Sequence, residues 1–84
     1  MKRSDVTFGQ LDKALRSLGF KAQPTKRDPP GRAYTHKAGA IIAIPSYRDN
    51  ERVYEHHLIA ARVELENFGL ADASLFAAKL QKAG

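Results

Sequence analysis

One short segment, Arg32 to His36, carries side chains that could act on a phosphodiester. Its residues alternate, so that Arg32, Tyr34 and His36 share one face of a predicted strand. Cleavage of RNA through the 2′-hydroxyl needs a base with a pKa near neutrality and a group that stabilises the phosphorane. His36 could be that base, with Arg32 or Arg27 holding the phosphate and Tyr34 beside them. Anion binding without cleavage and a plain strand surface are the alternatives.

The same segment can be interpreted as a binding face. Lys26 and Arg27 lie at the tip of a loop over 24–31, and Lys37 follows the strand. Lys and Arg contact phosphates, and an aromatic ring such as that of Tyr34 can stack on an unpaired base. The predicted RNA-binding residues are Lys26, Arg27, Arg32, Tyr34 and Lys37, and His36 is the single catalytic candidate.

Other reactive residues predict no further site. His56 and His57 are adjacent on a predicted helix, so they point about 100° apart and cannot bind one metal ion together. The loop over 24–31 has a single glycine and is no phosphate-cradling P-loop. Neither Ser46 nor Ser74 is accompanied by a base and an orienting acid. We therefore expect no metal and no cofactor.

Local signals place a first helix and three strands around this segment. Thr7 and Gln10 form a capping-box pattern, and the apolar stripe that follows runs to Gly19, a left-handed stop. Strands are predicted at about 20–24, 32–37 and 40–45.

Two helices are predicted after the third strand. Asp49 or Asn50 could cap the first of them, which ends at Gly69. Asp72 could cap the second, a tail helix to Lys82 with Leu75, Phe76 and Leu80 inside, docked on Ile59 and Val63. The order α-β-β-β-α-α predicts an α+β fold with a three-stranded antiparallel sheet and helices on one face. The predicted core is Leu11, Leu15, Leu18, Ile42, Ile44, Leu58, Leu65 and Phe68.

Composition limits the possible functions. The 84 residues suffice for one domain with a thin core, and 43% of them are hydrophobic. No cysteine and no apolar run of membrane-spanning length are present, which favours a soluble protein of the reducing cytoplasm. The net charge is +5, and it is uneven: residues 1–48 hold ten Lys or Arg against three acids, whereas residues 49–84 hold four against six. Such a basic half can attract a polyanion.

Several sequence segments, in their order along the chain, resemble the HicA toxin family, which are small bacterial ribonucleases of toxin–antitoxin pairs. They are "LDKALRSLGF" in the first helix and strand, "AYTH" in the second strand, "IIAIPSYR" after it and "HLIAARVELENFGL" in the next helix. The tail "ADASLFAAKL" is similar to an extension of some members. The resemblance implies one HicA-like domain over 1–84 with a helical extension over 71–84. It also implies an αβββα fold like a double-stranded-RNA-binding domain, RNA as substrate and a HicB-like antitoxin as partner.

The sequence departs from the family at its catalytic motif. The family places Gly-Ser-His ahead of the aromatic residue of its second strand, and Gly31 occupies the position of that histidine here. His36 matches the family's second, non-catalytic histidine. The resemblance thus implies an RNA-directed protein that binds RNA and would be an mRNA endoribonuclease if active. The alternative is an inactive interaction module that binds a HicB-like antitoxin or self-associates through the edge of its first predicted strand.

Overall fold

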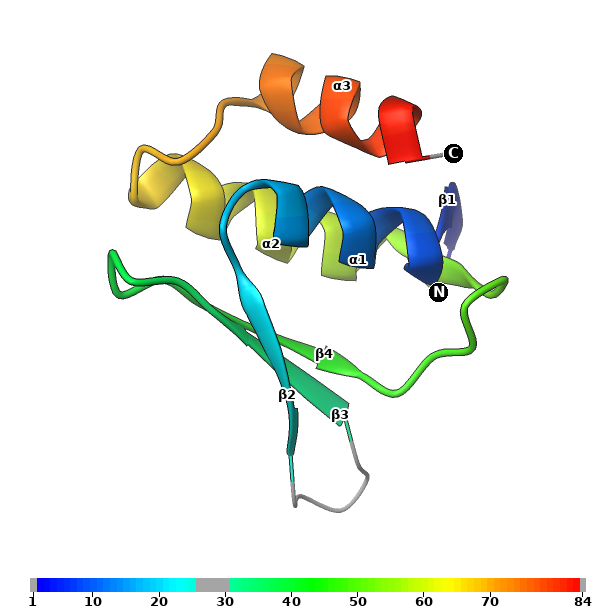
Figure 1. Cartoon of the computed structure of the whole chain (residues 1–84). Helices are drawn as coiled ribbons and strands as arrows, with labels where there is room; N and C mark the ends of the chain where they lie inside the picture. The colour runs from blue at the N-terminus through cyan, green and yellow to red at the C-terminus, as the bar shows by residue number, and fades with distance from the viewer. Residues whose placement is uncertain (1, 26–30, 84) are drawn as a thin grey trace.

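The computed structural model describes residues 2–25 and 31–83, which form eight elements (Figure 1). In chain order these are β1 (Arg3–Thr7), α1 (Phe8–Ser17), β2 (Lys21–Thr25), β3 (Gly31–Thr35), β4 (Ile41–Pro45), β5 (Arg52–Tyr54), α2 (Glu55–Asn67) and α3 (Ala73–Ala83). The expected α+β class is confirmed, with α1, a three-stranded antiparallel sheet β2-β3-β4, α2 and a further C-terminal helix. The strands β1 and β5 come in addition.

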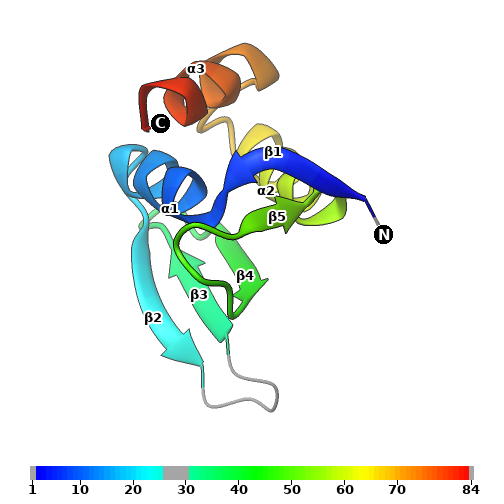
Figure 2. The same cartoon turned by 90° about the vertical axis from the view of Figure 1, so that its right-hand side faces the viewer.

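The elements stack in layers. An antiparallel sheet of order β2-β3-β4 forms one layer, and α1 and α2 lie together on one of its faces (Figures 1 and 2). The third helix, α3, lies on the far side of these two helices and packs mainly along α1. A separate pair, β1 and β5, runs beside the helices (Figure 2).

The ends of α1 follow the local signals. The Thr7 hydroxyl accepts the Gln10 N–H at 3.2 Å and the Gln10 side chain accepts the Thr7 N–H at 2.9 Å, which completes the capping box. At the other end, Gly19 has φ 98° and Phe20 N–H donates to the Leu15 carbonyl at 3.1 Å, as in a Schellman ending. The second helix ends in the same way at Gly69, which has φ 66°.

The β1–β5 pair was not predicted, and it displaces the expected start of α2. The prediction that Asp49 or Asn50 caps this helix is wrong, because the chain first forms β5 and the helix begins at Glu55. Arg3 pairs with Tyr54 across the two strands, and Val53 is fully buried. A pairing between segments nearly 50 residues apart leaves no signal in local periodicity.

The core contains most of the expected residues and several others. Leu11, Leu15, Ile42, Ile44 and Leu65 are buried, whereas Leu18 and Leu58 pack partly buried against them. Phe68 was also expected inside, but it is the C-cap of α2 and is 42% exposed. Other buried side chains are those of Phe8, Phe20, Tyr34, Val53, Phe76 and Leu80.

The tail helix docks on a different surface from the expected one. Ile59 and Val63 remain 50% and 44% exposed, so the prediction that α3 covers them is wrong. Phe76 and Leu80 are buried, and Gln10 Nε2 donates to the Leu80 carbonyl at 3.3 Å, which ties α3 to α1. Leu75, expected inside, is 42% exposed.

Both edges of the three-stranded sheet carry a proline that points its nitrogen outward. His36 N–H donates to the Ala40 carbonyl, which fixes the alternation of hydrogen bonds along the sheet. The backbone N–H and C=O groups that point away from the sheet are therefore those of residues 22 and 24 on β2 and of residues 41, 43 and 45 on β4. Pro24 and Pro45 have no N–H to offer, and the Ile41 N–H donates to Glu64 Oε2 at 3.1 Å. Ala22 and Ala43 keep the outward N–H groups of these edges.

Candidate functional site

The strand β3 holds Arg32 and His36 apart. His36 follows the strand at its turn end, and Arg32 lies four residues earlier, which in an extended chain is about 13 Å. A base and a phosphate clamp acting on one phosphodiester must reach the same few atoms. The structure therefore does not bring these two candidates into one site.

Tyr34 lies between them and points into the core. Its side chain is fully buried, so the expectation that its ring offers a stacking surface is wrong. The phenol O–H donates to Asp12 Oδ1 at 2.6 Å. Burial, followed by the hydrogen bond to Asp12 and its charge, raises the pKa of Tyr34 well above the usual tyrosine value. Tyr34 is a core residue with a satisfied polar end.

Asp12 also holds Arg32. The carboxylate accepts two bonds from Arg16 Nε at 3.1 and 3.0 Å, and Arg32 lies 3.7 Å away as a second cation. The Arg32 guanidinium also sits 5.1 Å from the Phe8 ring centroid. Arg32 is thus partly committed to α1, although its side chain remains 44% exposed.

His36 supports the turn between β3 and β4. Its Nδ1 accepts the Ala38 N–H at 3.0 Å, and its ring packs on Phe20 with centroids 5.1 Å apart. A Cβ added at Gly19 would lie 3.0 Å from His36 Nε2. Both the ring and one nitrogen of His36 therefore have structural contacts.

The position that the family resemblance assigns to a catalytic histidine is closed by backbone. A Cβ on Gly31 would lie 2.6 Å from the Ile44 carbonyl oxygen, closer than real Cβ contacts allow. Without a shift of β4, no side chain fits there. Gly31 is therefore required by the packing of these two strands.

The remaining predicted binding residues are all cations. Lys37 is exposed in the turn after β3. Lys26 and Arg27 lie outside the described residues.

A cluster that the sequence patterns missed surrounds Tyr47. Its hydroxyl accepts the Tyr54 N–H at 3.2 Å and is hydrogen-bonded to His57 Nδ1. The His56 ring stacks on Tyr54, with centroids 5.7 Å apart, and Arg3 covers Tyr54 at 4.2 Å. Tyr47 lies in an irregular loop, so no spacing linked it to the histidines of α2.

His57 makes stability depend on pH. Burial, with a smaller effect of the His56 charge, lowers the pKa of His57 below its usual value of 6.5. The folded state thus favours neutral imidazole, whose Nδ1 can accept the Tyr47 proton. This stabilisation is fully present above about pH 6.5 and is lost as the pH falls through the folded pKa.

We expect thermal melts between about pH 8 and pH 5 to show this loss. Wild-type protein should lose more Tm on acidification than His57→Gln, in which the titrating group is gone. His56→Gln is the matched control, because His56 precedes His57 on the same helix and is exposed. Equal acid sensitivity of wild type and His57→Gln would contradict the prediction.

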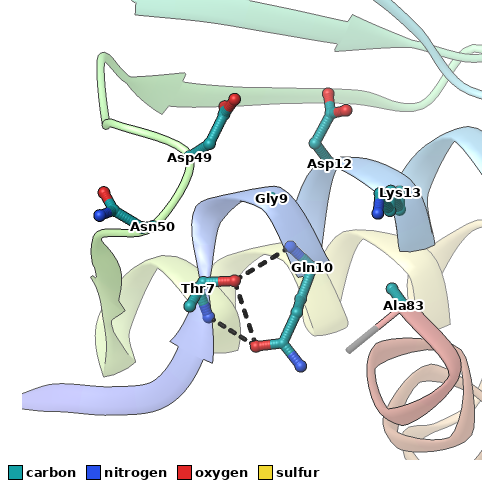
Figure 3. A pocket seen from close by; sticks show the side chains of 8 residues that line it. All are labelled: Thr7, Gly9, Gln10, Asp12, Lys13, Asp49, Asn50 and Ala83. Atoms are coloured by element: carbon teal, nitrogen blue, oxygen red, sulfur yellow. Dashed lines mark hydrogen bonds between the residues drawn. The ribbon is translucent and has the colours of Figure 1, made fainter.

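The hollow at the N-terminus of α1 does not favour anions (Figure 3). The Phe8 and Gly9 N–H groups donate to the carbonyls of Glu51 and Asp49 at 2.8 and 2.9 Å, so the free donors of a helix start are used. The carboxylates of Asp12 and Asp49 line this hollow, as Figure 3 shows.

A second hollow, between α1 and α3, is cationic. Lys13 and Ser17 line it from α1, and Lys79, Lys82 and Ala83 line it from α3, around a volume of about 250 Å³. We call it the α1–α3 hollow. Its lysines could not be grouped from the sequence, because α3 was expected on another surface.

Within residues 2–25 and 31–83, no three His, Cys, Asp or Glu side chains come together in a way that could hold a metal ion. Among the helices described, none is both long and apolar enough to cross a membrane.

Comparisons of the chain with protein-family models, with curated proteins and with solved structures find no match.

Proposed function

We propose that this protein binds RNA through cations that its own acidic residues leave free. The observation that carries the proposal is the pairing of charges on the described surface. Six Lys and Arg residues lie within 4.0 Å of a carboxylate, namely Lys2, Arg3, Arg16, Arg32, Arg52 and Arg62. Six others in the described ranges form no such pair, namely Lys13, Lys21, Lys37, Arg48, Lys79 and Lys82.

The acidic residues are almost all engaged. Those outside the ion pairs include Glu64, which accepts the Ile41 N–H, and Asp72, which accepts the Leu75 N–H at the start of α3. Of the acids described, only Asp49 has neither kind of partner for its side chain. The unpaired charge is therefore largely positive, which suits a polyanionic ligand.

The geometry around β3 supports binding rather than cleavage. Gly31 has no room for a side chain, and His36 and Arg32 lie at opposite ends of the buried Tyr34. A ribonuclease of the resembled family would need a proton-transfer group at the position of Gly31. The protein we propose is thus a HicA-like, RNA-binding member of a toxin–antitoxin type system. It would act in the cytoplasm, with a HicB-like antitoxin as its partner.

The test is a titration of labelled single-stranded RNA at several salt concentrations. Each phosphate contact should add roughly 0.7 to the slope of log affinity against log salt. We expect binding that weakens steeply with salt and leaves the RNA intact after long incubation. Salt-insensitive or undetectable binding would overturn the proposal. Cleavage that His36→Ala abolishes would replace binding by catalysis as the function.

A second candidate, a protein-interaction module, is favoured by an apolar row on α2. Ile59 and Val63 are about half exposed, and Ile59 also borders an apolar groove with Leu58 and Phe76. If RNA does not bind, capture of a purified HicB-like protein by wild type but not by Ile59→Glu/Val63→Glu would support this candidate.

A further inference from the structure

We propose that the α1–α3 hollow is the place where the RNA backbone binds, with a phosphate held between Lys13, Lys79 and Lys82. This inference rests on the proposed function and gives it a location. It places the main contact on the helical side of the molecule, away from the strand segment that the sequence favoured.

Helix geometry aims the lining side chains at a shared space. Lys13 and Ser17 are four residues apart on α1, and Lys79 and Lys82 are three apart on α3, so each pair lies on one face of its helix. Both faces line the α1–α3 hollow. Cations from two elements can therefore approach one anion from different sides.

The two helices are fixed relative to each other. Phe76 and Leu80 are buried on α3, and the Gln10 side chain of α1 is bonded to the Leu80 carbonyl. Because Lys79 and Leu80 are neighbours, this bond positions one wall of the hollow. The helices that carry the lysines thus need no rearrangement on binding, and only the lysine side chains have to be ordered.

The lysines of the hollow have no ion-pair partner among the described residues. The described residues that line the hollow include no Asp or Glu. Lys13 also lines the neighbouring hollow at the start of α1, which contains Asp12 and Asp49, whereas Lys79 and Lys82 do not. Glu66 and Asp72 line another hollow beside Gly69. A phosphate between the lysines would reduce their mutual repulsion.

The chemistry of the hollow predicts recognition of the backbone without sequence preference. The Ser17 hydroxyl already donates to the Ala14 carbonyl at 2.7 Å, so it has no free proton to offer. The ammonium groups act as point charges rather than as planar forks. Phosphate contacts of this kind fix position and carry no base information.

The experiment compares two triple variants with the same loss of charge. One variant, Lys13→Gln/Lys79→Gln/Lys82→Gln, removes the three positive charges of the hollow. The other, Lys21→Gln/Lys37→Gln/Arg48→Gln, removes three unpaired cations elsewhere. The probe is labelled mixed-sequence single-stranded RNA, titrated between 50 and 200 mM salt. Because the hollow holds one phosphate, we expect its variant to lower the salt slope by roughly 0.7, so that the affinity lost over this range becomes roughly 3-fold smaller. The other variant should change the slope less.

Different failures have different meanings. If wild-type protein shows no salt-sensitive RNA binding, the proposed function fails and the location with it. If wild type binds and both triple variants weaken equally, or the control weakens more, the location is wrong while the function stands. Lys13→Arg/Lys79→Arg/Lys82→Arg should retain wild-type binding. Should the glutamine triple melt early, Lys82→Gln alone should still weaken RNA binding more than Lys37→Gln, a single charge removed at another exposed position.

Discussion

Tyr34→Ala is expected to lower the free energy of unfolding by about 3–5 kcal/mol, the range for removing a large buried aromatic side chain. The ring is fully buried beneath α1, and its loss would leave a cavity in a thin core. It would also remove the hydroxyl that donates to Asp12 and leave Arg32 as the partner of Asp12 from β3. Urea unfolding followed by circular dichroism measures the change. A loss below about 1 kcal/mol would mean that the ring is not part of the core.

Tyr34→Phe is the matched control, because it keeps the ring and removes only the hydroxyl. Loss of the hydrogen bond to the charged Asp12 should lower the free energy of unfolding by about 1–3 kcal/mol, which is less than the effect of the alanine change. The raised pKa of the phenol adds a second readout. Stability from this group is fully present below about pH 10 and falls as the pH rises further, since only the unfolded state ionises readily. Tyr34→Phe should lack this part of the alkaline loss.

Truncation after Leu70 is expected to have a comparably large effect. It removes α3 and with it the buried side chains of Phe76 and Leu80, each worth about 1.5–3 kcal/mol of burial. The summed loss approaches the whole stability of a small domain. We therefore expect a truncated protein that melts early and forms aggregates by size-exclusion chromatography.

Two point changes within α3 provide the control for truncation. Phe76→Ala should reproduce much of the destabilisation, whereas Leu75→Ala, its half-exposed neighbour, should change the Tm little. A truncated chain that stays monomeric with an unchanged Tm would show that α3 contributes nothing to the fold.

Sequence patterns predicted the elements whose signals are local. The capping box at Thr7 and Gln10 and the helix ends at Gly19 and Gly69 depend on residues within one or two turns. The three strands of the main sheet begin and end within about two residues of their expected limits. The β1–β5 pair and the docking of α3 depend on contacts between distant segments, and no local pattern encodes these contacts.

The candidate site shows the same division. Alternation correctly placed Arg32 and Tyr34 on one face of β3, but alternation does not say which face is buried. The face that carries Tyr34 turned out to be the one that α1 covers, with Ala33 on the other. The α1–α3 hollow could not be foreseen, because Lys13 and Lys79 meet only through the tertiary packing of their helices.

The outward prolines at the sheet edges limit how a protein partner can attach. An extended peptide adds to a sheet by pairing with a row of outward N–H and C=O groups. Pro24 interrupts this row on β2, and Pro45 and the Glu64 side chain interrupt it on β4. Self-association by β-augmentation is thus disfavoured at either edge. A protein partner would therefore have to recognise side chains, or the separate β1–β5 pair, rather than add a strand to this sheet. At such a surface a change at a single residue could alter which partner is accepted.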